Sequence, residues 1–122
     1  MRLLLDTHVL LWWATDDQKM PKDIRLLLAD ERNEVFFSSI SIWEVAIKSA
    51  QLGIPADLLD ERARHNGLIP LHFDTRHARQ VAKLPPHHFD PFDRALIAQA
   101  LCEPLVLVSR DRWFAQYPVQ LV

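Results

Sequence analysis

The sequence predicts an α/β fold of three layers, in which helices cover both faces of a central, mainly parallel sheet of four to five strands. Two observations support this prediction. Short apolar runs alternate with longer segments of helical periodicity, as expected when parallel strands are buried on both faces. Acidic residues also recur just after apolar runs, at the exits of the predicted strands. With 122 residues, 49% of them hydrophobic, the chain has the size of one domain spanning residues 1–122.

The first elements alternate between strand and helix. The aliphatic run Arg2–Leu5 predicts a strand. Thr7–Trp13 and Pro21–Asp30 carry apolar residues at helical spacing, and the early proline of the second segment suits the first turn of a helix. Glu34–Ser38 contains a valine and two phenylalanines in succession, which predicts the second strand.

The middle of the chain continues the alternation. Ser41 and Glu44 have the spacing of a capping box and predict the start of another helix. Ala56–His65 predicts a further helix, which Asn66 and Gly67 would end. Leu68–Phe73 predicts a third strand, although its Pro70 cannot donate to a sheet ladder.

The last third supplies the most apolar helix. Asp74–Leu84 predicts a helix ended by two prolines, and the segment from Asp90 to Ala100 predicts a central, buried helix. Leu105–Val108 predicts the fourth strand, and Val119–Val122 predicts a short fifth strand at an edge.

Composition narrows the class of protein. The formal charge of −2 argues against a broad basic surface that coats nucleic acid, so any polynucleotide contact is expected at a local patch. No apolar run approaches the ~18 residues of a membrane span, and the single cysteine, Cys102, cannot form an internal disulfide. These features predict a cytoplasmic protein without membrane contact.

Four acidic residues form the main candidate site: Asp6, Glu44, Asp93 and Asp111. Each follows an apolar run and precedes a helical stretch, and segments that leave parallel strands at their carboxyl ends converge on one crevice. Taken singly, each acid has an ordinary alternative role as a cap or first-turn residue of a helix. Helix capping does not explain why several strands each deliver an acid to the same edge, so the joint pattern favours a metal site.

The ligand type indicates the metal. Mg²⁺ and Mn²⁺ prefer hard oxygen ligands, and such ions can polarise a phosphodiester and activate a bound water. Zinc fits less well, because the histidines and the one cysteine do not form a closed zinc pattern and His87-His88 are adjacent. We interpret that pair as part of a loop.

Four segments resemble the PIN-domain ribonucleases, and within them the VapC-type toxins of toxin–antitoxin pairs. They span nearly the whole chain in the expected order: Leu3–His8, Ser38–Glu44, Asp90–Ala100 and Leu107–Asp111. The resemblance implies a PIN-like α/β/α fold and a metal-dependent endoribonuclease. It also implies an RNA substrate, a cognate antitoxin that binds the chain, and a homodimer.

Carried over by position, Asp6, Glu44, Asp93 and Asp111 correspond to the acidic quartet of that family, which binds Mg²⁺ or Mn²⁺. Asp6 and Asp93 would be the principal ligands, and Asp111 corresponds to the most variable position of the quartet. Asp90 is an additional acid, which we assign to a helix cap rather than to the metal.

Other polar residues lie beside the quartet in the sequence. Thr7 and Ser39 match small hydroxyl residues that flank the site in the family, with local backbone capping as the alternative. Arg94 and Arg110 are candidate phosphate contacts, with a solvated surface role as the alternative.

Two other functions remain open at the level of sequence. One is a phosphatase-like hydrolase with Asp6 as an aspartyl nucleophile, but His8 stands where the haloacid-dehalogenase pattern has its acidic proton donor. The other is a non-catalytic PIN-like module that uses the acidic cleft only to engage a partner.

Overall fold

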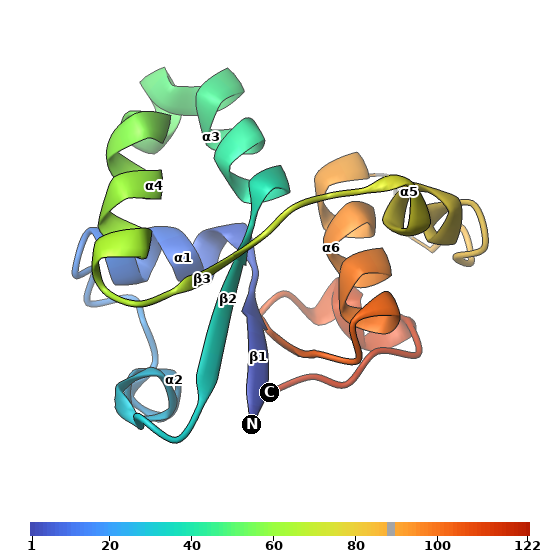
Figure 1. The fold of residues 1–122 in the computed structure, drawn as a ribbon, viewed down its shortest axis with the longest axis horizontal. Helices are drawn as coiled ribbons and strands as arrows, with labels where there is room; N and C mark the ends of the chain where they lie inside the picture. The colour runs from blue at the N-terminus through green and yellow to red at the C-terminus, as the bar shows by residue number, and fades with distance from the viewer. Residues whose placement is uncertain (88–89) are drawn as a thin grey trace.

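The described residues, 1–87 and 90–122 of the computed structural model, form a sheet of four parallel strands in the order β3-β2-β1-β4 (Figure 1). The strands are β1 (Arg2–Leu5), β2 (Glu34–Ser38), β3 (Ile69–Leu71) and β4 (Val106–Val108). In the register, Leu4 of β1 lies opposite Phe36 of β2 and Leu107 of β4. The prediction of a parallel central sheet is therefore confirmed.

Alternate residues of the central strand enter two separate cores. Leu3 and Leu5 pack into one core and Leu4 into the other, and all three are fully buried. A strand with apolar residues on both faces explains the continuous aliphatic run in the sequence. Each such leucine contributes roughly 1.5–3 kcal/mol to folding through its burial.

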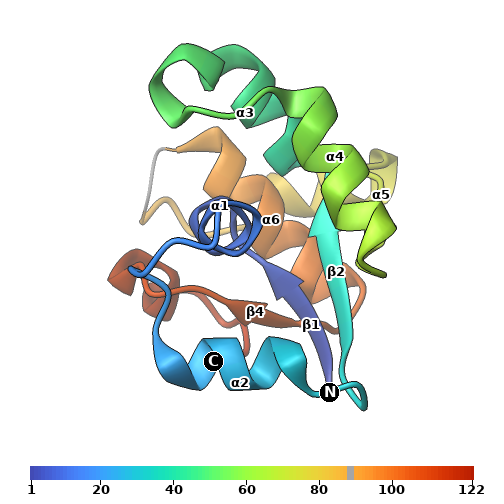
Figure 2. The same ribbon diagram turned by 90° about the vertical axis from the view of Figure 1, so that its left-hand side faces the viewer.

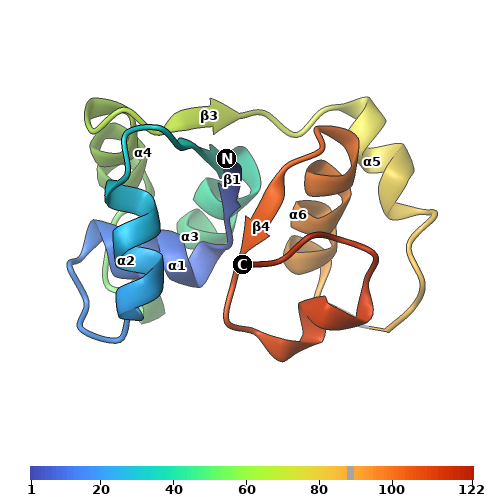
Figure 3. The ribbon, with the colours of Figure 1, turned by 90° about the horizontal axis from the view of Figure 1, so that it is seen from below.

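Helices form the two outer layers (Figures 1 and 3). α1 (Thr7–Ala14), α2 (Lys22–Ala29) and α4 (Ala56–His65) cover one face, and Figure 2 views this layer from outside. α5 (Thr75–Val81) and α6 (Pro91–Cys102) cover the other face. α3 (Ser39–Leu52) continues directly from the end of β2 and carries buried side chains into both cores.

α3 begins earlier than the sequence predicts. Its N-cap is Ser38, whose hydroxyl accepts a hydrogen bond from the Ile40 N–H at 2.9 Å. The predicted capping box of Ser41 and Glu44 is therefore wrong, because both residues lie inside the helix. The Ser41 hydroxyl instead hydrogen-bonds the Thr7 hydroxyl at 2.9 Å and ties α3 to α1.

The C-terminal segment also differs from the prediction. A short 3-10 helix, η1 (Arg112–Gln116), follows β4, and Val119–Val122 does not form a full strand. Contact with the sheet is an isolated bridge between Leu107 and Leu121. β4 is only three residues long, which leaves little edge for a further strand to pair with.

The other elements lie where the sequence predicts them: β1, β2 and α4 have the predicted bounds, α1 is one residue longer, and α2, β3, α5 and β4 are shorter. Pro70 sits in β3 at the edge of the sheet, where its missing donor is tolerated. α4 ends at the predicted signal, with Asn66 as C-cap and Gly67 at φ +84°. In the part of the chain that the structure describes, every helix falls short of the length and apolar character that a bilayer crossing requires. His88, half of the histidine pair, lies outside the described residues.

Candidate active site

A cavity of about 270 Å³ gathers four acidic residues from three parts of the chain. Its lining comprises Thr7, His8, Leu11, Glu44, Lys48, Leu52, Asp90, Asp93, Asp111 and Trp113. Larger hollows of about 560, 380 and 330 Å³ lie elsewhere, but each of them is lined by one acid beside one or two arginines. The concentration of carboxylates, rather than cavity size, marks the 270 Å³ cavity as the candidate site.

Asp6 is buried beside this cavity and linked to it through Ser109. The Asp6 carboxylate is the N-cap of α1, accepting a hydrogen bond from the Val9 N–H at 2.8 Å. Its second oxygen accepts a hydrogen bond from the Ser109 hydroxyl. The Ser109 oxygen in turn accepts from the Asp111 N–H at 3.0 Å. A single serine therefore connects the acid after β1 to the acid after β4.

Burial sets the electrostatic state of Asp6. The residue is only 3% exposed, and desolvation raises the pKa of its carboxyl above the ordinary value of 3.8. The hydrogen bonds from Ser109 and Val9 oppose this change, whereas the negative field of Asp111 adds to it. The folded chain thus holds a carboxylate that a nearby cation would stabilise.

Glu44 presents an oxygen that lacks a protein partner. Its side chain is 8% exposed, and Oε2 accepts a hydrogen bond from the Lys48 Nζ at 3.0 Å. Among the described residues, no hydrogen-bond partner is found for its buried Oε1. A buried carboxylate oxygen is costly unless it meets a donor or a cation, so this orphaned atom fits a metal site.

Lys48 stands among the acids. Its hydrogen bond to Glu44 raises the pKa of the ammonium group, and the negative charges of Asp90 and Asp93 act in the same direction. No motif in the sequence marks this lysine as a site residue. Its position four residues after Glu44 on one helix was the available signal.

Asp90 and Asp93 come from the start of α6. Asp90 is the N-cap and accepts hydrogen bonds from the N–H groups of Phe92 at 2.9 Å and Asp93 at 3.2 Å, as the sequence predicts. Asp90 also lines the cavity. Since an ionised carboxylate has about four acceptor positions, a capping hydrogen bond leaves others available to a cation. Capping and metal binding are therefore compatible at Asp6, Asp90 and Asp111.

The two hydroxyl residues predicted to flank the site, Thr7 and Ser39, lie in different places. Thr7 lines the cavity, and its hydroxyl bonds to Ser41. Ser39 does not line it: its hydroxyl accepts from the Phe73 N–H at 3.0 Å, and its side chain borders the 330 Å³ hollow. Ser39 therefore ties the start of α3 to the segment that follows β3, a long-range contact that differs from the local capping alternative.

The structure places both predicted phosphate-binding arginines in other contacts. Arg110 is ion-paired with Asp23 in the first turn of α2. The Arg94 guanidinium donates to four acceptors at 2.8–3.5 Å: the carbonyls of Val81, Leu84 and Pro85 and the hydroxyl of Tyr117. These bonds hold the end of α5 and the following loop against α6, so we correct Arg94 to a structural residue. Charge alone did not reveal where either side chain would point.

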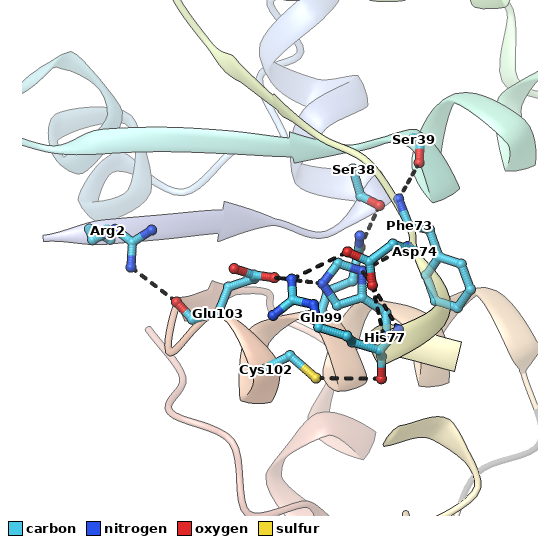
Figure 4. A network of polar contacts seen from close by, with 10 residues as sticks. Arg2, Ser38, Ser39, Phe73, Asp74, His77, Gln99, Cys102 and Glu103 are labelled. Carbon is cyan, nitrogen blue, oxygen red and sulfur yellow. Dashed lines mark hydrogen bonds and ion pairs between the residues drawn. The ribbon is translucent and has the colours of Figure 1, made fainter. Parts of the chain in front are cut away.

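A second acidic group lies between α5 and α6 (Figure 4). Asp74, His77 and Glu103 are the set of described residues whose ligating atoms all lie within 4.8 Å of one another. His77 Nδ1 accepts from the Asp74 N–H at 3.0 Å, so the proton is on Nε2, which donates to Glu103 at 2.7 Å. Arg76 also donates to Glu103, at 2.6 Å.

This second group is better explained as a capping network than as a metal site. Both nitrogens of the His77 ring are engaged, so neither offers a lone pair to an ion. Arg76 already supplies a positive charge to both Asp74 and Glu103. At the 270 Å³ cavity, by contrast, Glu44 Oε1 is buried without a hydrogen-bond partner among the described residues. The oxygen-rich set of Asp6, Glu44, Asp90, Asp93 and Asp111 is the one that suits a hard divalent cation.

Comparison with known proteins gives the same family as the residue pattern. The model of the PIN domain family matches residues 3–120. Ribonuclease VapC22 from Mycobacterium tuberculosis is 30% identical over 118 residues, which cover 90% of this chain and 87% of that protein.

Solved structures share the fold at lower identity. A DNA-bound VapBC from Salmonella typhimurium gives a TM-score of 0.75 at 20% identity, covering 100% of this chain and 97% of the matched chain. VapBC2 from Rickettsia felis, bound to a DNA fragment from its promoter, gives 0.74 at 17% identity, with 100% and 98% covered. A toxin–antitoxin complex from Klebsiella pneumoniae gives 0.70 at 18% identity, with 98% and 95% covered.

Proposed function

Because the chain belongs to the PIN-domain family, we propose that it is a Mg²⁺- or Mn²⁺-dependent endoribonuclease and the toxin of a type II toxin–antitoxin pair. The observation that carries this proposal is the cavity in which acids from α3, α6 and the segment after β4 meet beside the buried Asp6. The 30% identical relative is a ribonuclease, which supports RNA as the substrate.

The residues in and beside the cavity would have different roles in the proposed reaction. Asp6, Glu44, Asp93 and Asp111 would hold the divalent ion or ions, with Asp90 beside them. A bound ion would polarise the scissile phosphate and lower the pKa of a water molecule. Ser109 positions Asp6 and Asp111 relative to each other through its two hydrogen bonds. The hydrogen bond between Thr7 and Ser41 fixes α1 against α3, which carry Leu11 and Glu44 into the cavity wall.

The geometry does not favour an aspartyl nucleophile. Asp6 is 3% exposed, and both of its oxygens accept hydrogen bonds. A nucleophile must present a free oxygen in line with the phosphorus atom. Its burial and its two hydrogen bonds instead support the proposed role of Asp6 in orienting and holding the ion.

RNA cleavage by purified protein tests the proposal. Single-stranded RNA would be incubated with Mg²⁺ or Mn²⁺ and with the parent, Asp93→Asn or Asp74→Asn. We expect Asp93→Asn to lose about 100-fold or more in rate, since even residues that merely orient metal ligands contribute about 10–100-fold. Asp74→Asn, an acid-to-amide change at a helix cap outside the cavity, should cleave like the parent. Equal rates for all three proteins would refute the nuclease, and manganese binding without cleavage would favour a non-catalytic module.

We further propose an antitoxin partner and a homodimer. The solved relatives are toxin–antitoxin complexes. In this chain, Trp43 and Ile47 of α3 are 55% and 59% exposed, and Leu58 of α4 is also exposed, which provides apolar surface for a partner. Growth arrest on expression, relieved by the product of the adjacent gene, tests the antitoxin. Light scattering of the purified chain tests the dimer.

A further inference from the structure

Lys48 is a cation inside the acidic cavity. Its ammonium lies 3.0 Å from Glu44 Oε2. The Lys48 side chain is 36% exposed, and the Glu44 side chain is 8% exposed. Asp90, Asp93 and Asp111 line the same cavity. The ammonium also lies 5.3 Å from the centroid of the Phe92 ring, at the start of α6.

An ordinary helical salt bridge does not account for this arrangement. A Glu–Lys pair four residues apart on an exposed helix face contributes about 0.3–0.5 kcal/mol and joins two solvated groups. Here the glutamate is buried, and its other oxygen, Oε1, is without a partner among the described residues. In addition, α3 bends at Lys48 itself, where φ is −109° and ψ is 20°. The kink occurs with no proline or glycine in α3.

We propose that Lys48 is the resident cation of the acidic cavity: it neutralises Glu44 in the metal-free chain and must leave Oε2 when a divalent ion binds. The inference rests on the proposed metal site. An ion coordinated by Glu44 oxygens would lie ~2.0–2.6 Å from them, in the space that the ammonium approaches. Two cations so close together repel strongly at the effective dielectric of protein interiors, so one must withdraw.

The structure offers the lysine a place to withdraw to. The face of the Phe92 ring already lies within cation–π distance of Nζ. The bend at Lys48 allows a local adjustment of the side chain without breaking the helical turn that carries Glu44. Metal binding is therefore an exchange of one positive charge for another. The lysine stabilises the metal-free chain and weakens the apparent affinity for the ion.

Calorimetric titration with Mn²⁺, without RNA, tests the exchange. Lys48→Met keeps the length of the side chain but removes its charge, and Lys48→Arg keeps the charge. Lys83→Met, at an exposed position outside the cavity, changes the net charge equally. We expect Lys48→Met to bind Mn²⁺ about two- to fivefold more tightly than the parent, the fold-change that corresponds to losing one such ion pair. Lys48→Arg and Lys83→Met should bind like the parent.

Two further measurements report on the lysine directly. Metal-free Lys48→Met should melt below the parent, and saturating Mn²⁺ should remove that difference. In the parent, the NMR signals of the Lys48 Cε methylene should shift on titration with Mg²⁺, while those of Lys83 stay in place. The proposed exchange would be refuted if Lys48→Met and Lys83→Met bound Mn²⁺ with equal affinity, or if the Lys48 signal did not shift with Mg²⁺. Neither result would contradict the proposed nuclease activity. If the parent binds no Mn²⁺ at all, both proposals fail.

Discussion

Replacing Asp6 by asparagine should stabilise the metal-free chain and abolish its stabilisation by metal. Burial raises the pKa of the Asp6 carboxyl above 3.8. Just above pH 3.8, the unfolded chain has lost a proton that the folded chain still holds, so this group lowers the stability as the pH rises. Asparagine has the same shape, carries no charge and can still accept the capping hydrogen bond from Val9.

The size of the effect follows from the length of the chain. An unfolding entropy of about 2.1 cal/mol/K per residue gives roughly 0.26 kcal/mol/K for 122 residues. A stabilisation of about 1 kcal/mol, typical of relieving an unfavourable group, then raises Tm by about 4 °C. Mn²⁺ at 100 times its dissociation constant adds about 2.7 kcal/mol, or roughly 10 °C, to the parent.

Thermal melts with EDTA and with Mn²⁺ measure both effects. At neutral pH, Asp6→Asn should melt above the parent in EDTA and below it in saturating Mn²⁺, so the order of the two proteins reverses. The difference in EDTA should vanish below about pH 3.8, where Asp6 is protonated in both states. Asp74→Asn is the matched control, because hydrogen bonds lower the pKa of Asp74 and its removal relieves no strain. A metal-free Asp6→Asn that melts below the parent and gains equally from Mn²⁺ would refute this reasoning.

Two other substitutions probe the polar networks. Ser109→Ala removes the link between Asp6 and Asp111. We expect the free energy of unfolding, measured in urea, to fall by about 1–3 kcal/mol, and Mn²⁺ binding, measured by calorimetry, to weaken roughly 10- to 100-fold. An unchanged Mn²⁺ affinity would contradict this role of Ser109. The hydrogen bond from His77 lowers the pKa of Glu103 below 4.5, so this carboxylate stabilises the fold above that pH and the effect is lost on acidification. Glu103→Gln should therefore flatten the fall in Tm below pH 4.5 while leaving Mn²⁺ affinity unchanged, and weaker binding would instead point to a second metal site.

The sequence predicts the layers of the fold well because each element carries its own local signal. The aliphatic run of β1 and the apolar α6 could be read without knowing their partners. The start of α3 was misplaced because Ser38 and Ser41 are both acceptable N-caps. Only the end of β2 decides between them. Val119–Val122 has the composition of a strand but finds only a single bridge to the short β4.

The sequence predicted which acidic residues gather at the candidate site, but it did not predict which residues hold them in position. Asp111 was predicted from its position at the carboxyl end of a strand, and Asp90 from its position at the start of a helix. Ser109 was missed because its bond to Asp6 joins residues 103 positions apart and exists only once β1 and β4 pair. Arg94 was misassigned because sequence gives a charge but no direction, and its neighbours in space are the carbonyls at the end of α5.

The pairing of β1 with β4 has a consequence for the timing of activity. These neighbours in the sheet are about 100 residues apart in the sequence, whereas β2 can pair with β1, and β3 with β2, before β4 has been synthesised. Until β4 docks, Asp6 lacks Ser109, and Asp111 is not yet beside it. Domains fold as the ribosome extends them from the N-terminus. A nascent copy is therefore expected to lack an assembled acidic site until the segment that carries Ser109 and Asp111 has been synthesised and has folded.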